Sequence, residues 1–397
     1  HRDGYGFARP YGSGEDLFLP AHEMAQVFDG DEAQVSILRV DARGRAEGQI
    51  AKVLKRAQKK LVGRYLEENG KGFFCPHDAR LPNRILIPLQ QAFGARTGQI
   101  VLIELTEYPT SISLAKGKVV EILGNHLDPG LEIDVAIRSH DIPWQWPDAV
   151  LREAALLRDQ QIDPKELSRV DLRAIPFVTI DGEAAKDLDD AVWSEPNERG
   201  FRLMVAIADV SHYVSVGSAL DLEASSRGNS VYFPDRVVPM FPEVLSNGLC
   251  SLNPGLDRLA LVCEMQINFS GILEDYTFFE AVINSRDRLT YTEVAAAIEQ
   301  DCPQSLTADR RADIDRLRKL YRVLHAARVR RGALDFDTCE TEFDFDEYRK
   351  IASIKAVDRN DAHRLIEECM LLANVAAARF LQSLDYPTLF RVHEGPT

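Results

Sequence analysis

Apolar strands and glycine-rich turns follow one another twice, in the same order, along the first third of the chain. Gly4 to Pro10 (GYGFARP) is matched by Gly70 to Pro76 (GKGFFCP), and each copy continues into a short apolar run that ends in proline. A glycine-led strand and a closing strand complete each copy. Four matching strands in about 65 residues are typical of a small β-barrel. The pattern therefore predicts two all-β barrels in tandem, over residues 1–57 and 58–125.

The pattern changes after a connector over residues 126–170. Arg202–Val214 and Leu261–Ile267 are apolar runs that predict buried strands. Asp309–Arg331 has one apolar stripe and is followed by glycine, which predicts an amphipathic helix. Asp361–Leu381 is apolar nearly all round, which predicts a helix buried on all sides. Residues 171–397 are thus expected to form a mixed α/β domain.

The charge of the chain is unevenly distributed. The net charge is −15, but residues 1–125 carry 17 Lys and Arg against 15 Asp and Glu, and they include the basic run Lys52–Lys60 (KVLKRAQKK). Local charge steers a polyanion, whereas total charge mainly sets solubility, so the acidic total argues only weakly against RNA binding. No stretch approaches the roughly 20 uninterrupted apolar residues of a membrane helix. We therefore expect no membrane contact.

The N-terminal residues and the cysteines predict a cytoplasmic protein. His1 to Phe7 has the features of neither a signal peptide nor a transit peptide, and it resembles the middle of a strand, so we expect further residues upstream. The six cysteines are far apart, and none forms a C-x-x-C pair. Reduced thiols are the ordinary state of such cysteines in a long chain.

Four aspartates stand together in the stretch Thr179–Val192 (TIDGEAAKDLDDAV), directly after one apolar strand and before another. They are Asp181, Asp187, Asp189 and Asp190. Clustered carboxylates repel one another unless a cation neutralises them, and Mg²⁺ prefers such oxygen ligands. The spacing excludes an EF-hand. Spacing alone does not decide between a metal site and an acidic surface loop.

Longer blocks of sequence resemble one enzyme family. IDGEAAKDLDDAV, VAIADVSHYV, RGNSVYFPDRVVPMFPEVLSNGLCSLNP and NDAHRLIEECMLLAN stand in this order after residue 170. They resemble the RNB-domain family of 3′-5′ exoribonucleases (ribonuclease II and ribonuclease R), and most of all its bacterial ribonuclease R members. Both barrels are similar to the cold-shock-type OB barrels of that family. The resemblance implies two tandem OB-type barrels followed by an RNB catalytic domain, of which residues 171–397 would be the N-terminal part only.

The resemblance also implies the metal and its ligands. Asp181, Asp187, Asp189 and Asp190 would hold the catalytic Mg²⁺, and the loss of Asp189 would affect the chemistry most.

Three further residues would bind the 3′ end of the RNA. Tyr232 would lie beside the scissile phosphate and Phe336 would clamp the last bases, although each residue is also suited to a packed core. Glu368, or Glu367 if the match is displaced by one residue, would accept hydrogen bonds from the terminal ribose hydroxyls. Acidic residues on an otherwise apolar helix require a partner or a function. An ion pair between Glu368 and Arg364 is the simple alternative.

Phe7 and Phe73, within the repeated G-x-G-F motif, are candidates for stacking on RNA bases. A single ring of this kind is better explained as barrel core. The duplication, together with the intervening basic run, favours base stacking.

These assignments lead to one functional expectation. The complete protein would be a processive, hydrolytic exoribonuclease that degrades single-stranded RNA to nucleoside 5′-monophosphates by a Mg²⁺-dependent two-metal mechanism. We expect it to be a monomer. The first alternative is a non-catalytic RNA-binding protein with an inactive RNB shell, against which the four crowded carboxylates argue. The second is a phosphoesterase for a small molecule, which would not need two barrels.

Overall fold

The chain folds into two compact units with separate hydrophobic cores. The computed structural model describes residues 4–12, 14–40, 44–78, 80–81, 84–158, 168–299, 307–334, 340–357 and 359–390. The first unit comprises His1–Trp144 with Phe345–Ala352, and the second comprises Gln145–Asp344 with Ser353–Thr397.

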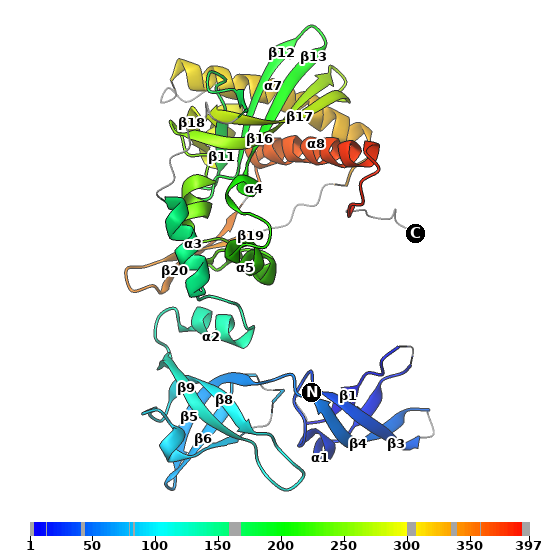
Figure 1. Ribbon diagram of the computed structural model, residues 1–397, viewed down its shortest axis with the longest axis vertical. Coiled ribbons are helices and arrows are strands. Elements are labelled where there is room, and N and C mark those ends of the chain that lie inside the picture. Colours follow the sequence, from blue (N-terminus) through cyan, green and yellow to red (C-terminus); the bar gives the residue numbers. More distant parts are fainter. Residues whose placement is uncertain are drawn as a thin grey trace. The chain divides into compact units, whose positions relative to one another are not determined.

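The first repeat forms a four-stranded sheet in the order β1-β2-β4-β3 (Figure 1). Its elements are β1 (Gly6–Ala8), β2 (Leu17–Leu19), α1 (Ala21–Met24), β3 (Glu32–Val40) and β4 (Ala46–Lys55). Leu19 and Val27 are buried in this part of the chain, whereas Phe28 is buried in the core of the second repeat. Over its described residues this sheet is open.

The second repeat forms a closed barrel in the order β5-β6-β7-β9-β8. Its elements are β5 (Lys60–Glu68), β6 (Lys71–Pro76), β7 (Ile85–Ile87), the 3-10 turn η1 (Leu89–Gln91), β8 (Gln99–Glu107) and β9 (Lys116–Asn125), followed by α2 (Leu131–Ser139). β6 to β9 repeat the order of β1 to β4, which confirms the predicted duplication. β5 pairs with both β6 and β8 and so closes the barrel around the fully buried Phe74 and Ile85.

Close packing explains the second glycine of the G-x-G-F motif. A Cβ atom at Gly72 would lie 2.6 Å from the carbonyl oxygen of Ile87 and 2.8 Å from the Tyr65 hydroxyl. At Gly6 it would lie 2.4 Å from the sulfur of Met24, a flexible side chain. A backbone carbonyl of a paired strand cannot move aside so easily. The requirement for glycine is therefore stricter in the second barrel.

We expect Gly72→Ala to lower the thermal midpoint of unfolding, because the added methyl group would push β6 away from β7. Overpacking of this kind costs about 1–3 kcal/mol, which corresponds to a loss of roughly 4 °C or more in a domain of this size. Circular dichroism during heating measures the change. Lys71→Ala, at the exposed neighbouring position of β6, is the control. An unchanged midpoint in Gly72→Ala would contradict the packing argument.

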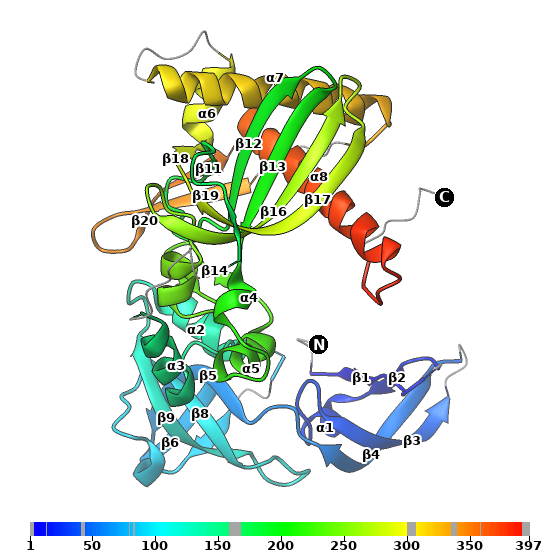
Figure 2. The same cartoon turned by 45° about the horizontal axis from the view of Figure 1, so that its top comes forward.

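A seven-stranded sheet forms the centre of the second unit, in the order β10-β17-β16-β13-β12-β11-β18 (Figure 2). Its strands are β10 (Val170–Asp171), β11 (Val178–Asp181), β12 (Asp190–Asn197), β13 (Gly200–Ala208), β16 (Asp257–Asn268), β17 (Leu273–Asn284) and β18 (Asp287–Thr290). The inner pairs are antiparallel, whereas β10 and β18 pair in parallel at the two edges. Two smaller sheets pair β14 (Val231–Tyr232) with β15 (Val237–Val238), and β19 (Glu340–Phe345) with β20 (Ile351–Val357).

Helices cover both faces of the seven-stranded sheet. One face packs against α6 (Tyr291–Glu299), α7 (Ala308–Arg330) and α8 (Asp361–Ser383); the other packs against α3 (Asp148–Arg158), α4 (Val210–Tyr213), α5 (Ala219–Arg227) and the π-helical turn η2 (Val244–Leu249). Along β13, Leu203 and Val205 enter the first core, while Met204 and Ala206 enter the second. Burial on both faces explains why this strand is apolar at successive positions. No helix within the described residues is long and apolar enough to cross a membrane.

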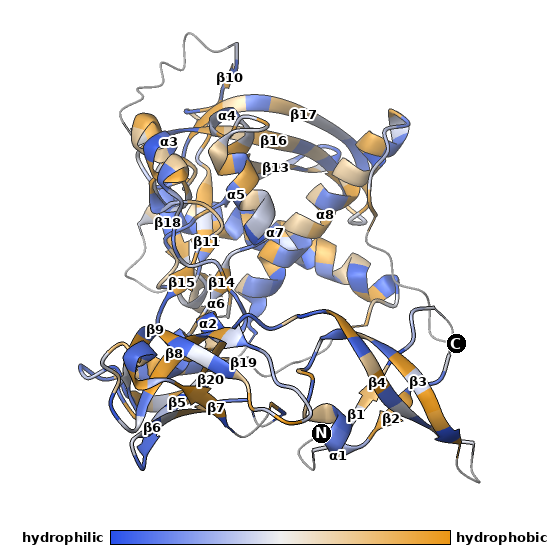
Figure 3. Ribbon diagram, turned by 60° about the horizontal axis from the view of Figure 1, so that its bottom comes forward, coloured by the Kyte–Doolittle hydropathy of each residue, from blue (hydrophilic) through white to orange (hydrophobic). Residues whose placement is uncertain are grey.

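The helix predicted to be buried on all sides, α8, is buried on one side only. Ile366 and Cys369 are buried against the sheet, whereas Leu371 and Val375 are 44% and 42% exposed. Hydrophobic and hydrophilic residues alternate along both α7 and α8 (Figure 3). Only one side of a helix can pack on a sheet, so apolar residues on its opposite side stay in solvent. The prediction of complete burial is therefore wrong.

Candidate active site

The loop between β11 and β12 carries the four predicted aspartates. β11 ends at Asp181 and β12 begins at Asp190. The loop is anchored by Leu188, which is 2% exposed and whose backbone N–H donates to the Ser251 hydroxyl at 3.1 Å. The carbonyl oxygens of Leu188 and Asp189 accept hydrogen bonds from the backbone N–H groups of Leu252 and Ala208. These contacts fix the backbone that presents the carboxylates.

The aspartates influence one another electrostatically. Burial raises the pKa of Asp190 to about 7, and the charges of Asp189 and Asp181 add to this effect. Burial is also the main cause that raises the pKa of Asp181, with Asp187 contributing. Burial, followed by the charges of Asp181 and Asp187, raises the pKa of Asp189. The four carboxyl groups are thus close enough for their charges to act on one another.

The donor set is chemically suited to a hard divalent cation. All four side chains offer carboxylate oxygens, and Asp190 Oδ2 is buried without a hydrogen-bond partner among the described residues. Neutralisation by a cation would relieve both the repulsion and the unsatisfied oxygen. The side chains are not arranged as a finished coordination shell, since no three His, Cys, Asp or Glu groups converge on one point in the described part of the chain. Binding would require the carboxylates to turn toward the ion.

Tyr232 lies at this loop and is 65% exposed, so it is not a core residue. Its hydroxyl donates a hydrogen bond of 2.8 Å to Asp187 Oδ2. Partial burial of the hydroxyl, together with this hydrogen bond, raises the pKa of Tyr232 to about 12. The phenol therefore stays protonated at neutral pH and can act as a hydrogen-bond donor beside the aspartates.

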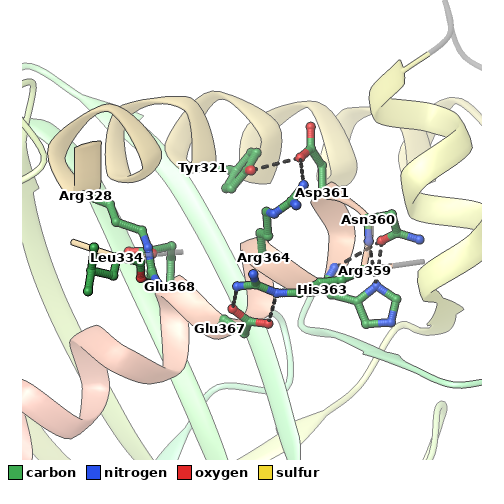
Figure 4. Close-up of polar contacts among 10 residues, drawn as sticks. All are labelled: Tyr321, Arg328, Leu334, Arg359, Asn360, Asp361, His363, Arg364, Glu367 and Glu368. Carbon is green, nitrogen blue, oxygen red and sulfur yellow. Dashed lines mark hydrogen bonds and ion pairs between the residues drawn. The ribbon is translucent and has the colours of Figure 1, made fainter. Parts of the chain in front are cut away.

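The two glutamates of α8 are held by different arginines (Figure 4). Glu368 is 4% exposed and accepts a hydrogen bond of 2.9 Å from Arg328 Nη1 at the C-terminal end of α7. Arg328 also donates to the carbonyl oxygen of Leu334 at 3.5 Å. Glu367 is half-buried and accepts two hydrogen bonds from Arg359, one of them 2.8 Å long from Nε.

The ion pair considered from the sequence, between Glu368 and Arg364, does not form. Arg364 instead donates to Asp361 at 3.3 Å, and the Tyr321 hydroxyl donates to the same carboxylate oxygen at 3.0 Å (Figure 4). The spacing of four residues on one helix suggested the pair. Glu368 instead forms its ion pair with Arg328, which comes from the neighbouring helix α7.

Sequence reasoning missed two residues beside the aspartates, Tyr291 and His363. Their rings are stacked, with centroids 4.0 Å apart. After burial, the charges of Asp181, Asp190 and Asp189 are the main causes that raise the pKa of Tyr291. No spacing rule joins these two residues, because they come from different helices.

The aromatic candidates of the first unit lie on outer surfaces. Phe7 is 60% exposed and forms a cluster with Tyr5 and Phe18, with ring centroids 5.6–6.0 Å apart. Phe73 is half-buried, and the Arg84 guanidinium lies 5.2 Å from its ring centroid. Both rings therefore differ from their buried neighbours in the barrel cores. Phe336 lies outside the described residues.

The basic run is partly neutralised within the first unit. Arg56 forms an ion pair of 2.7 Å with Asp31, and Lys55 forms one of 3.1 Å with Glu32. Lys52, Lys59 and Lys60 are exposed and form no ion pair with any described residue. These three lysines are the charges of the run that remain available to a polyanion.

Comparison with known proteins identifies the family. The ribonuclease B OB domain matches residues 1–53, the cold shock domain residues 73–147, and the RNB domain residues 169–397. Ribonuclease R of Acidithiobacillus ferrooxidans is 46% identical over 339 residues, which are 85% of this chain and 77% of that protein. The chain belongs to the RNB-domain family. The predicted membership is thereby confirmed.

Other relatives show how much of an RNB-domain protein the chain represents. Ribonuclease R of Vibrio parahaemolyticus is 48% identical over 405 residues, covering 100% of this chain and 48% of that protein. The chain thus spans about half the length of the curated relatives it matches.

A solved structure matches the fold as well. The apo form of Mycoplasma genitalium RNase R has a TM-score of 0.89 at 28% identity, over 96% of this chain and 60% of that one. The same protein in complex with ribose-methylated single-stranded RNA gives a TM-score of 0.86 at 27% identity, over the same shares of the two chains. The predicted order, OB-type domains followed by an RNB domain, is confirmed.

Proposed function

We propose that the complete protein is a processive, hydrolytic exoribonuclease that shortens single-stranded RNA from its 3′ end and releases nucleoside 5′-monophosphates. The observation that carries the proposal is the anchored loop between β11 and β12, with four mutually repelling carboxyl groups and an unsatisfied buried oxygen on Asp190. A non-catalytic RNA-binding protein would not need to keep such a destabilising cluster intact.

The residues that would hold Mg²⁺ are Asp181, Asp187, Asp189 and Asp190. When bound, Mg²⁺ supplies Lewis acidity for the hydrolysis of a phosphodiester. Tyr232 donates to Asp187, which keeps the phenol at the edge of the cluster, where it could contact the scissile phosphate.

The barrels would guide the RNA toward this loop. Phe7 and Phe73 offer aromatic faces to bases, and Lys52, Lys59 and Lys60 offer charge to phosphates. Mycoplasma genitalium RNase R has been solved with ribose-methylated single-stranded RNA, which supports the same class of ligand here. We assign residues 1–57 and 58–125 to the barrels, 126–170 to the connector and 171–397 to the catalytic domain.

Phe336 keeps its proposed role as a clamp on the last bases.

We also place the protein in the cytoplasm as a monomer. The cysteines that the structure describes, Cys75, Cys250, Cys263 and Cys369, form no disulfide, and three of them are buried. Burial of thiols in apolar cores suits a reducing compartment.

The direct test is a divalent-metal titration of RNA cleavage by the full-length protein. A 3′-labelled single-stranded RNA should lose its label first and as a mononucleotide, with no reaction in EDTA and activity restored by Mg²⁺. Internal cleavage products, or cleavage that persists in EDTA, would contradict the proposed reaction.

Discrimination between RNA and DNA ends is expected to depend on Glu368, or on Glu367. A carboxylate that accepts hydrogen bonds from the terminal hydroxyls is left under-satisfied by a 2′-deoxy end, at a cost of about 1–3 kcal/mol. We expect Glu368→Ala to reduce the difference in cleavage rate between an all-RNA substrate and one with a single 3′-terminal deoxynucleotide. Steady-state rates on the two substrates measure this difference.

Each glutamate pairs with an arginine, so the alanine variants need controls. Glu368→Ala leaves Arg328 without its carboxylate partner and could lower the stability of the fold. Glu368→Gln keeps an oxygen acceptor for Arg328, and it therefore separates a loss of ribose recognition from a loss of stability. Glu367→Ala tests the neighbouring carboxylate, which is the more exposed of the two. An undiminished preference for RNA in both alanine variants would place sugar recognition elsewhere.

A further inference from the structure

The stacked pair of Tyr291 and His363 has no task in the proposed reaction. Tyr291 is the first residue of α6, and His363 lies in the first turn of α8. Their ring planes are 18° apart with centroids separated by 4.0 Å, which is a face-to-face contact. Thr290, the residue before Tyr291, pairs with Asp181 where β18 meets β11, which places Tyr291 next to the aspartate loop. Burial, followed by the charges of Asp181, Asp190 and Asp189, raises the pKa of Tyr291. The pair therefore forms part of the wall around the aspartates.

His363 is held in place by the start of α8. Its Nδ1 lies 3.3 Å from the backbone nitrogen of Asn360 and 2.8 Å from Asn360 Oδ1, and the tautomer of the ring decides whether Nδ1 accepts from the first or donates to the second (Figure 4). Asn360 Oδ1 also accepts from the backbone N–H groups of Ala362 and His363. This reciprocal arrangement is a capping box, in which the third helical residue returns a hydrogen bond to the N-cap. The imidazole is thus fixed at its edge while its face contacts Tyr291.

We propose that His363 is a positioning residue that holds the Tyr291 ring at the aspartate site. The inference rests on the proposed nuclease function, because that function brings the 3′ end of the RNA to the aspartates, beside the Tyr291 ring. A support of this kind acts on turnover more than on affinity, since the barrels hold most of the RNA. Displacement of a positioning group by about 1 Å can lower a rate roughly 100-fold.

Two substitutions separate support of the ring from capping of the helix. His363→Gln keeps a hydrogen-bond acceptor at the capping position, where glutamine is a natural residue, but removes the aromatic face. His363→Phe keeps an aromatic face and removes the acceptor. The ¹⁹F NMR signal of Tyr291 in this chain labelled with 3-fluorotyrosine, assigned with Tyr291→Phe, reports the order of the ring. Single-turnover cleavage and RNA binding by the full-length protein report the functional effect.

We expect His363→Gln to shift and broaden the Tyr291 signal and to lower the single-turnover rate roughly 10- to 100-fold. The dissociation constant for RNA should change less than about twofold, which is well under 1 kcal/mol. His363→Phe should restore a narrow signal and most of the rate, with a lower thermal midpoint because the cap is lost.

Two results would overturn the proposal. If His363→Gln kept the full rate and a narrow signal, His363 would serve the helix cap alone. If His363→Phe lost as much rate as His363→Gln, the aromatic face would not be the feature that matters. Failure of the wild-type protein to degrade RNA would reject the proposed function, while the ¹⁹F comparison would still decide whether His363 holds Tyr291.

Discussion

Replacement of Asp189 by asparagine should abolish RNA cleavage while leaving RNA affinity nearly unchanged. The backbone at Asp189 is fixed by the hydrogen bond from Ala208 N–H to its carbonyl oxygen, so the substitution changes the side-chain charge without moving the loop. Loss of a residue that merely supports a metal ligand lowers activity 10–100-fold, so we expect loss of a ligand to exceed roughly 100-fold. Affinity should persist because the proposed function assigns most of the RNA binding to the barrels.

Multiple-turnover rates and RNA-binding isotherms of the full-length variant measure these two effects. Glu195→Gln, which removes one negative charge near the opposite end of β12, is the matched control and should cleave normally. The thermal midpoint of metal-free Asp189→Asn should not fall, because the substitution removes a charge that repels Asp190. Normal cleavage by a correctly folded Asp189→Asn protein would exclude Asp189 from the reaction.

Removal of residues 1–125 should weaken binding of poly(A) roughly 100-fold or more. Stacking of one base on an aromatic side chain contributes about 1–3 kcal/mol, and the deletion removes both Phe7 and Phe73. It also removes Lys52, Lys59 and Lys60, which form no ion pair with any described residue. At about −0.7 per phosphate contact for single strands, these lysines would contribute roughly −2 to the slope of log affinity against log salt. Affinities measured across a salt series test both quantities.

Deletion of residues 1–125 could also disturb folding. Substitutions in the intact chain therefore test the role of the barrels in RNA binding separately. Phe7→Ala with Phe73→Ala should weaken binding of poly(A) and poly(U) alike, whereas Tyr386→Ala, at an exposed aromatic residue of the second unit, should not. Equal affinities of the deletion and the parent for poly(A) would remove the barrels from RNA binding.

The sequence by itself determined the features that depend on residues close together in the chain, namely the turns, the short strands and the loop that carries the aspartates. The repeated G-x-G-F strands predicted the duplicated strand order, because turns and short strands are set by local glycine and apolar spacing. The position of the aspartates between two apolar strands predicted a loop that joins those strands, and the structure has that loop between β11 and β12. The strand β5, which closes the second barrel, was not predicted because it lies outside the repeated segment.

Only the tertiary structure decided which distant side chains meet. Glu368 has Arg328 as its partner rather than Arg364, since α7 and α8 pack on the same face of the sheet and bring their side chains together. The same packing stacks Tyr291 on His363 and leaves the opposite side of α8 in solvent. Local spacing encodes neighbours along one helix or strand. Contacts between elements depend on how their apolar faces pack together, and no single segment of the chain specifies that arrangement.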